Sequence, residues 1–202
     1  MILSIGKLQE LLTRNEVQNI LNSISKNYPR LVDELIPAHL TLGGVQRVLQ
    51  NLLKERVPIN DMVTILETLL DYAPQTKDIE VLTEYVRQAL SRFITKSFTQ
   101  EGYLHAFTLD PRWELKLKEA MDSGGHISPD DLGRLFRAIE NAVSSMGEKF
   151  KSIQPVIICS PFVRRFLRKL IERIIPSLVI LSTAEILPSV KIYTTGVVRY
   201  ED

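Results

Sequence analysis

The 202-residue sequence contains a single cysteine, Cys159, so no disulfide can form within the chain. It has no apolar run that approaches the ~18 residues of a membrane-spanning helix. Its first residues, MILSIGKLQELL, lack the basic leader, long apolar core and small-residue cleavage site of a secretory signal. These absences predict a soluble protein of a reducing, intracellular compartment.

Neither sign of charge is in excess. The chain carries 25 basic and 24 acidic residues, for a formal net charge of +1. No overall field therefore recruits nucleic acid or acidic lipid. Apolar residues make up 45% of the sequence and charged residues 24%, which is ordinary for a soluble globular protein. The length allows one large or two small domains, each with its own core.

The usual signatures of chemistry are also missing. There is no glycine-rich phosphate loop, and His39, His105 and His126 have no metal-ligand spacing to another ligand. Cys159 and Ser160 stand at a predicted strand-to-helix turn, where a nucleophile can be activated, but without the glycines of a nucleophile elbow. We interpret Cys159 as a buried thiol followed by a serine cap, and we predict no enzyme, no cofactor and no metal. A small hydrolase using Cys159 or Ser160 is the alternative.

The first part of the chain shows strong helical periodicity. Thr13 and Glu16 have the spacing of a capping box at the start of a helix over about residues 14–25. A short helical turn follows Pro29, and the next helix is expected over about residues 42–56. Two more are expected, one from its N-cap Asn60 to Pro74 and one from its N-cap Asp78 to Ile94.

The pattern changes near Ser97. The polar stretch 98–102 suits a domain junction, and strands are expected over 103–109, 155–159, 178–181 and 190–198. Between them, helices start at Asp110-Pro111, Ser128-Pro129 and Ser160-Pro161, the last reaching about residue 175. This order predicts parallel crossovers. The predicted fold is α+β and mostly helical: residues 1–12 end a preceding subdomain or form an added leader, 13–97 form an all-helical subdomain, and 98–202 form a small α/β subdomain with a mixed sheet.

Charged residues crowd the turn around Pro58, namely Lys54, Glu55, Arg56 and Asp61. Pairs of mixed sign at one corner are typical of a subunit contact, and they are equally compatible with an ordinary polar corner. Because exposed ion pairs contribute only ~0–1 kcal/mol, such a cluster orients an interface more than it stabilises one. We treat these four residues as a possible subunit interface.

The helix after Pro161 is the most basic element. Helical geometry predicts one broad basic side, made of Arg164, Arg165, Arg168 and Lys169. This side is a possible binding face for an acidic partner or phosphates, and the other interpretation is a solvated outer face. Only one helix is basic and no exposed aromatic series accompanies it, so we predict no binding to nucleic acid.

The stretch VQRVLQNLLKERVPINDMVTILETLLDYAP, residues 45–74, resembles the hallmark sequence of the FHIPEP family, the export-gate proteins shared by flagella and type III secretion systems. The resemblance begins near LLTRNEVQ (11–18) and VDELIP (32–37). It continues through TEYVRQAL (83–90) and FLRKLIERIIPSLVILS (166–182). Nearly the whole chain is covered.

The resemblance implies a setting that spacing alone does not show. Family members have a membrane half and a cytoplasmic half of four subdomains, of which this chain resembles the third and fourth, so Met1 is expected to lie inside a longer protein. The cytoplasmic half forms a homo-oligomeric ring at the cytoplasmic face of the bacterial inner membrane. Expected partners are other copies of the protein, other export-apparatus proteins, and chaperone–substrate complexes, which bind mainly through subdomains missing here.

The implied function is a non-enzymatic docking and ring-assembly module in flagellar protein export. The stretch TILETLLDYAP favours the flagellar branch. The equivalent module of a virulence (injectisome) secretion system is the alternative. We expect the chain by itself to be monomeric, because the family's ring also uses contacts from the missing subdomains.

Overall fold

The computed structural model describes residues 12–146 and 154–201. Its residues divide into two compact units, 1–94 and 95–202. The element order confirms a mostly helical α+β fold with a mixed sheet. The predicted boundary between residues 97 and 98 stays a prediction, since helix α7 (Ser91–Phe98) runs through it. Nearly all of the predicted segment 1–12 lies outside the described residues.

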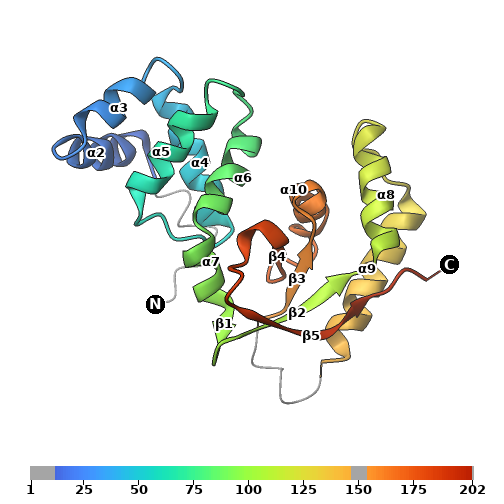
Figure 1. The fold of residues 1–202 in the computed structure, drawn as a ribbon. Coiled ribbons are helices and arrows are strands. Elements are labelled where there is room, and N and C mark those ends of the chain that lie inside the picture. Colours follow the sequence, from blue (N-terminus) through green and yellow to red (C-terminus); the bar gives the residue numbers. More distant parts are fainter. Residues whose placement is uncertain (1–11, 147–153, 202) are drawn as a thin grey trace. The chain divides into compact units, whose positions relative to one another are not determined.

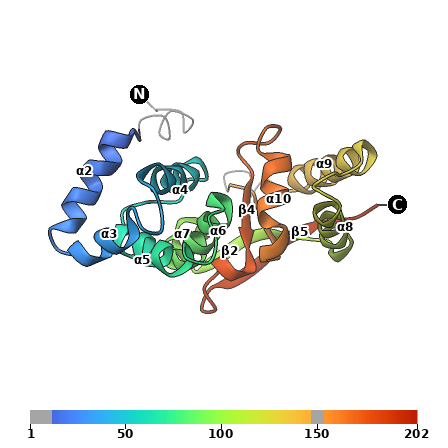
Figure 2. The same cartoon turned by 90° about the horizontal axis from the view of Figure 1, so that it is seen from above.

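The first unit is built of helices (Figures 1 and 2). The described ones are α2 (Arg14–Ser25), α3 (Pro29–Leu35), α4 (Leu42–Lys54), α5 (Met62–Tyr72), α6 (Ile79–Ala89) and the start of α7. Each buries the apolar stripe that its period predicts, with Val48, Leu66 and Val86 fully buried. Burial of these stripes against one another holds the unit together.

Local capping explains where these helices begin. The capping box is confirmed: the Glu16 N–H donates to Thr13 Oγ1 (3.3 Å) and the Thr13 N–H donates to Glu16 Oε2 (2.6 Å). Asn60 as the N-cap of α5 was wrong. The cap is Asp61, whose Oδ1 accepts from the Thr64 N–H at 3.2 Å. Thr64 also donates its hydroxyl to Asp61 Oδ2 at 2.9 Å, so the carboxylate fits this helix start better than Asn60 does.

The single helix expected up to Ile94 is two helices. Leu90 is the C-cap of α6, with φ −86° and ψ 12°, and α7 begins at Ser91. Leu90 and Ile94 are both buried on either side of this break. The apolar spacing therefore continues across it, and no proline or glycine marks it in the sequence.

The second unit contains a five-stranded mixed sheet. Its strands are β1 (Thr99–Gln100), β2 (Tyr103–Leu109), β3 (Val156–Cys159), β4 (Val179–Ser182) and β5 (Lys191–Val198). β1 is antiparallel to β2, whereas β3 and β5 are parallel to β2 and β4 is parallel to β3. The predicted parallel crossovers are confirmed, and β1, β4 and β5 each pair with a single strand.

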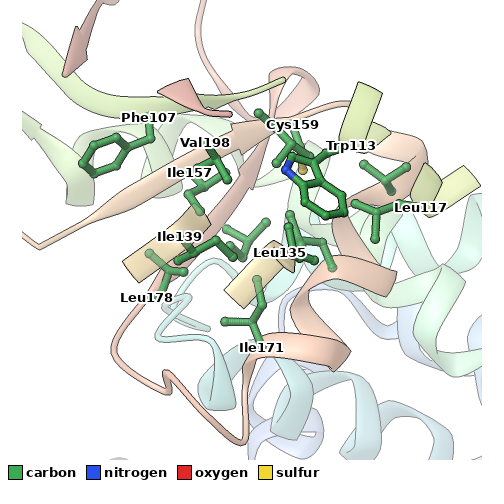
Figure 3. Packing of buried hydrophobic residues seen from close by; sticks show 14 of the residues in the cluster. Phe107, Trp113, Leu117, Leu135, Ile139, Ile157, Cys159, Ile171, Leu178 and Val198 are labelled. Carbon is green, nitrogen blue, oxygen red and sulfur yellow. The ribbon is translucent and has the colours of Figure 1, made fainter. Parts of the chain in front are cut away.

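Among the residues that the structure describes, three helices pack on one face of this sheet: α8 (Pro111–Asp122), α9 (Pro129–Ser144) and α10 (Pro161–Ile171). They share one apolar cluster with the strands (Figure 3), in which the labelled members are Phe107, Trp113, Leu117, Leu135, Ile139, Ile157, Cys159, Ile171, Leu178 and Val198. α10 ends at Ile171, earlier than the predicted residue 175. Its C-cap is Glu172, whose N–H donates to Arg168 O.

The chain after β5 is fastened to the start of α8. The Asp110 N–H donates to Val198 O (3.1 Å), and the Tyr200 N–H donates back to Asp110 Oδ2 (3.1 Å). Arg112 Nη2 donates to Tyr200 O at 2.7 Å and lies 3.2 Å from Asp110 Oδ2. The hydrogen bond from the Arg112 side chain, followed by that from its N–H, lowers the pKa of Asp110 from 3.8 to about 2, while burial acts in the opposite direction.

Asp110 should therefore make part of the stability depend on pH. Its carboxylate is favoured in the folded state, so its contribution is complete above 3.8 and is lost as the pH falls towards about 2. We expect Asp110→Asn, which retains a capping oxygen, to lower the free energy of unfolding at neutral pH. Urea unfolding at a series of pH values should show this difference shrinking across that window. A difference that stays constant would contradict the assignment.

Candidate interaction surfaces

The corner around Pro58 has a defined backbone geometry. At the end of α4 the Val57 N–H donates to Leu52 O (2.9 Å) and the Arg56 N–H donates to Leu53 O (3.0 Å). This is a Schellman motif. Arg56 occupies its left-handed position at φ 61°, where glycine is usual. Such a conformation in a bulky residue persists where the surroundings fix it, and is a pointer to function.

The four predicted interface residues lie at this one corner, but two of them bind groups within the unit and two are exposed. Glu55 Oε2 lies 3.2 Å from Arg87 Nη1, and the Arg87 side chain is only 2% exposed. Asp61 caps α5. Lys54 and Arg56 are exposed. The two acids thus bind groups of the unit itself, and the side chains that the corner exposes are those of Lys54 and Arg56.

The helix α10 does not present the predicted four-residue basic side. Arg164 is only 1% exposed and donates from Nη1 to Ile180 O (3.4 Å), while Arg168 donates from Nη1 to Leu178 O (2.9 Å). Phe162, an apolar residue in the first turn of the helix, is 77% exposed. As a solvent-facing surface the set of four was wrong, because β4 has carbonyl groups within reach of the two long arginine side chains. Arg165 is half-buried and Lys169 is exposed.

Cys159 and Ser160 lack the surroundings of a nucleophile. The Cys159 thiol is buried and donates to Leu181 O at 3.7 Å. The predicted serine cap was wrong, since Ser160 forms no side-chain cap. Its N–H donates instead to Glu114 Oε1 at 2.8 Å, so a carboxylate of the chain already occupies the helix start where an anion would bind.

The histidines are dispersed. His105 lies in β2 against the ring of Tyr193, with centroids 5.1 Å apart. The register Phe107↔Ile157 puts it opposite residue 155, four residues from Cys159, which is roughly 13 Å along a strand. His126 is exposed. Among the described residues, no group of three or more His, Cys, Asp or Glu side chains is placed to hold a metal ion, and no helix there is long and apolar enough to cross a membrane.

Two features were not recognised in the sequence. One is the burial of Arg87. Its position directly after buried Val86 in an amphipathic helix was the sequence signal available for it. The other is the exposure of apolar side chains on β5, where Ile192 is 46% and Val197 is 42% exposed. The run 190–198 was predicted as a strand, but which strand pairs with it depends on the fold.

The FHIPEP family model matches residues 3–191 of the chain. The flagellar biosynthesis protein FlhA of Bacillus subtilis is 35% identical over 195 residues, which is 94% of this chain and 28% of that protein. FlhA of Escherichia coli is 38% identical over 178 residues, which is 88% of this chain and 25% of that protein. The chain thus spans about a quarter of the length of the curated relatives it matches.

Solved structures show the same fold. The Chlamydia pneumoniae CdsV protein is 31% identical with a TM-score of 0.86, covering 95% of this chain and 56% of that chain. A match in the structure of a CdsV and CdsO complex from the same organism is 31% identical with a TM-score of 0.83, and it covers 96% of this chain and 58% of that chain. The nonameric EscV cytosolic domain from the type III secretion system is 29% identical with a TM-score of 0.81, and the match covers 98% of this chain and 59% of that chain. The resemblance noted in the sequence is confirmed, and the chain belongs to the FHIPEP family.

Proposed function

We propose that the chain is a docking and ring-assembly module of the flagellar type III protein export gate. The similarity to FlhA over most of the chain carries this proposal. The injectisome equivalent is the second candidate, supported by the CdsV and EscV structures. Identities of 35% and 38% to the two flagellar proteins, against 31% and 29% to these structures, favour the flagellar branch.

In this proposal the module works by contact and not by catalysis. The hydrolase alternative gains no support from the structure. Cys159 is buried, the Ser160 N–H already donates to Glu114, and the histidines are dispersed. The inward bonds of Arg164 and Arg168 weaken the case for nucleic acid, because two of the four cations contact carbonyl groups of the chain itself. We infer that the full-length protein acts at the cytoplasmic face of the inner membrane, with copies of itself, other export-apparatus proteins and chaperone–substrate complexes as partners.

Deletion of the segment encoding this chain, in the bacterium that carries it, tests the function. We expect loss of flagellar filaments and of export of flagellar proteins into the medium, with growth unchanged. Restoring the segment on a plasmid should restore both. Intact flagella together with lost secretion of virulence proteins would transfer the assignment to the injectisome. Normal behaviour in both assays would refute the proposal.

The corner around Pro58 is our proposed ring contact. Neighbouring copies in a closed ring meet through two different surfaces, so a basic corner can face an acidic surface on the next copy. We expect Lys54→Glu combined with Arg56→Glu to shift the full-length protein from rings to smaller species in size-exclusion chromatography with light scattering. Arg30→Glu, an exposed charge reversal on α3, is the matched control. Equal ring content in both variants would remove the corner from the interface, and the 202-residue chain alone should be monomeric.

A further inference from the structure

Two of the outer strands, β4 and β5, differ in whether the outward main-chain groups of their free edge are hydrogen-bonded. In β4 the Val179 N–H donates to Pro155 O (3.1 Å), so Val179 faces β3 and its neighbours Leu178 and Ile180 face outward. Side chains take up these outward groups: Arg168 binds Leu178 O, and Arg164 binds Ile180 O. Further along, the Ser182 N–H donates to the carboxylate of Glu185. The β4 edge is thereby closed to another strand.

The β5 edge has no such closure. The hydrogen bond from the Asp110 N–H to Val198 O shows that Val198 faces β2, so Val197 faces outward. The register between β2 and β5 shifts at a β-bulge between Ala106 and Phe107. Before this bulge the pair Ala106↔Thr194 gives Ile192 and Thr194 the same outward direction. Within the described residues β5 pairs with β2 alone, and no side chain there bonds the outward groups of these three residues. Three consecutive outward positions are thus left open.

Apolar side chains accompany this open edge. Of the eight exposed large hydrophobic residues in the described chain, four lie on β2 and β5, namely Tyr103, Ile192, Tyr193 and Val197. The register places Ile192 and Val197 on the sheet face of buried Leu104 and Tyr193 on the opposite face. An added strand would therefore find main-chain partners along the edge and apolar contacts on both faces.

We propose that β5 is a docking site at which an extended segment of another polypeptide joins the sheet as a further strand. Charge defines the chemistry of this segment. Between Glu185 and Glu201 the sequence has two charged residues, Lys191 and Arg199, one at each end of β5. Both are exposed. The fitting partner has alternating apolar residues flanked by carboxylates.

A second copy of β5 fits this edge poorly. Centred antiparallel pairing of two β5 strands would set Lys191 of one copy opposite Arg199 of the other, and in-register parallel pairing would set each cation opposite itself. Like charges directly opposite one another destabilise a strand pair. Charge thus selects a foreign acidic segment over self-association. This site lies within the second unit and does not depend on the proposed ring contact in the first.

The test uses the 202-residue chain and a synthetic peptide, acetyl-Asp-Glu-Val-Thr-Val-Thr-Val-Glu-Asp-amide. We expect the amides of Ile192, Thr194 and Val197 to exchange rapidly with deuterium in the free chain, and at least tenfold more slowly with saturating peptide. A peptide with lysines in place of its acids should bind at least fivefold more weakly in calorimetric titrations. Thr194→Pro removes an outward N–H while sparing the bonds to β2, and should weaken binding at least tenfold with unchanged circular dichroism.

A second measurement needs no protein variant. Of two peptides N-methylated at either all valines or all threonines, one should bind at least tenfold more weakly than the other, because alternate residues of an added strand point their N–H groups at β5. Equal binding of the two would overturn strand addition. So would no binding of the parent peptide at millimolar concentration, slow exchange of the three amides in the free chain, or a dimer in sedimentation that Thr194→Pro abolishes.

Discussion

Glu55→Gln should lower the free energy of unfolding by about 3 kcal/mol, the usual effect of removing one partner of a buried ion pair. Glu55 Oε2 lies 3.2 Å from Arg87 Nη1, and the side chains are 16% and 2% exposed. The substitution keeps the shape of Glu55 but leaves the buried guanidinium without this carboxylate. Urea unfolding followed by far-ultraviolet circular dichroism measures the loss. Glu67→Gln, at an exposed glutamate on α5, is the control and should stay within about 0.5 kcal/mol of the unaltered protein.

Arg87 is more deeply buried than Glu55, so the two substitutions of this ion pair should differ in their effect on stability. Arg87→Met should be less destabilising than Glu55→Gln, because the carboxylate left behind reaches water and the arginine does not. In the Arg87→Met background, Glu55→Gln should then have almost no effect. A full loss from Glu55→Gln in that background would show that Glu55 acts through the end of α4 and not through Arg87. The same pair fixes the residue next to Arg56, so the result also bears on the rigidity of the proposed ring contact.

Helix starts could be predicted from the sequence because their determinants are local. The capping residues Thr13, Asp78, Asp110 and Ser128 each lie within three residues of the helix amide groups that they cap. The strand at 103–109 was predicted with its bounds because it alternates and ends at an aspartate-proline pair. In such places the chain needs no information from distant residues.

The misplaced features depend on contacts that are distant in sequence. Arg164 looks solvated by residue type, yet its partner is the carbonyl of Ile180 on the strand that follows α10. Phe162 looks buried by type and is exposed at the first turn of that helix. An amphipathic pattern indicates which residues prefer water. A guanidinium can instead bind carbonyl groups at the open edge of a strand, and the periodicity of a helix does not indicate where such an edge lies.

The interaction surfaces illustrate the same division. The sequence placed Lys54, Glu55, Arg56 and Asp61 at one corner because they adjoin one proline, and the structure keeps them there. Glu55 forms its ion pair with Arg87, which lies on another helix, and the sequence alone does not indicate that these two residues pair. The open edge of β5 likewise becomes visible only when its pairing with β2 and the closure of β4 are both known.

Trp113→Ala should produce the largest loss in the second unit, about 4 kcal/mol in the free energy of unfolding. The indole is fully buried in the cluster beneath the sheet (Figure 3). Its Nε1 donates to Arg199 O at 3.0 Å, and its ring meets Tyr200 edge-on with centroids 4.7 Å apart. The substitution therefore removes core volume and the fastening of the chain after β5 together. Because Trp113 is the sole tryptophan, unfolding must be followed by circular dichroism.

Two companion variants separate these contributions. Trp113→Phe keeps most of the ring and its contact with Tyr200 but loses the hydrogen bond to Arg199 O, so it should be destabilised by about 1–2 kcal/mol. Leu115→Ala, on the same helix at a side chain that is 58% exposed, should change stability by less than about 0.5 kcal/mol. Deuterium exchange of the Tyr200 amide should accelerate in Trp113→Ala more than in Trp113→Phe. A Trp113→Ala variant within 1 kcal/mol of the unaltered chain would contradict the central place of this indole, since burial of this size cannot be lost without a cavity or a rearranged core.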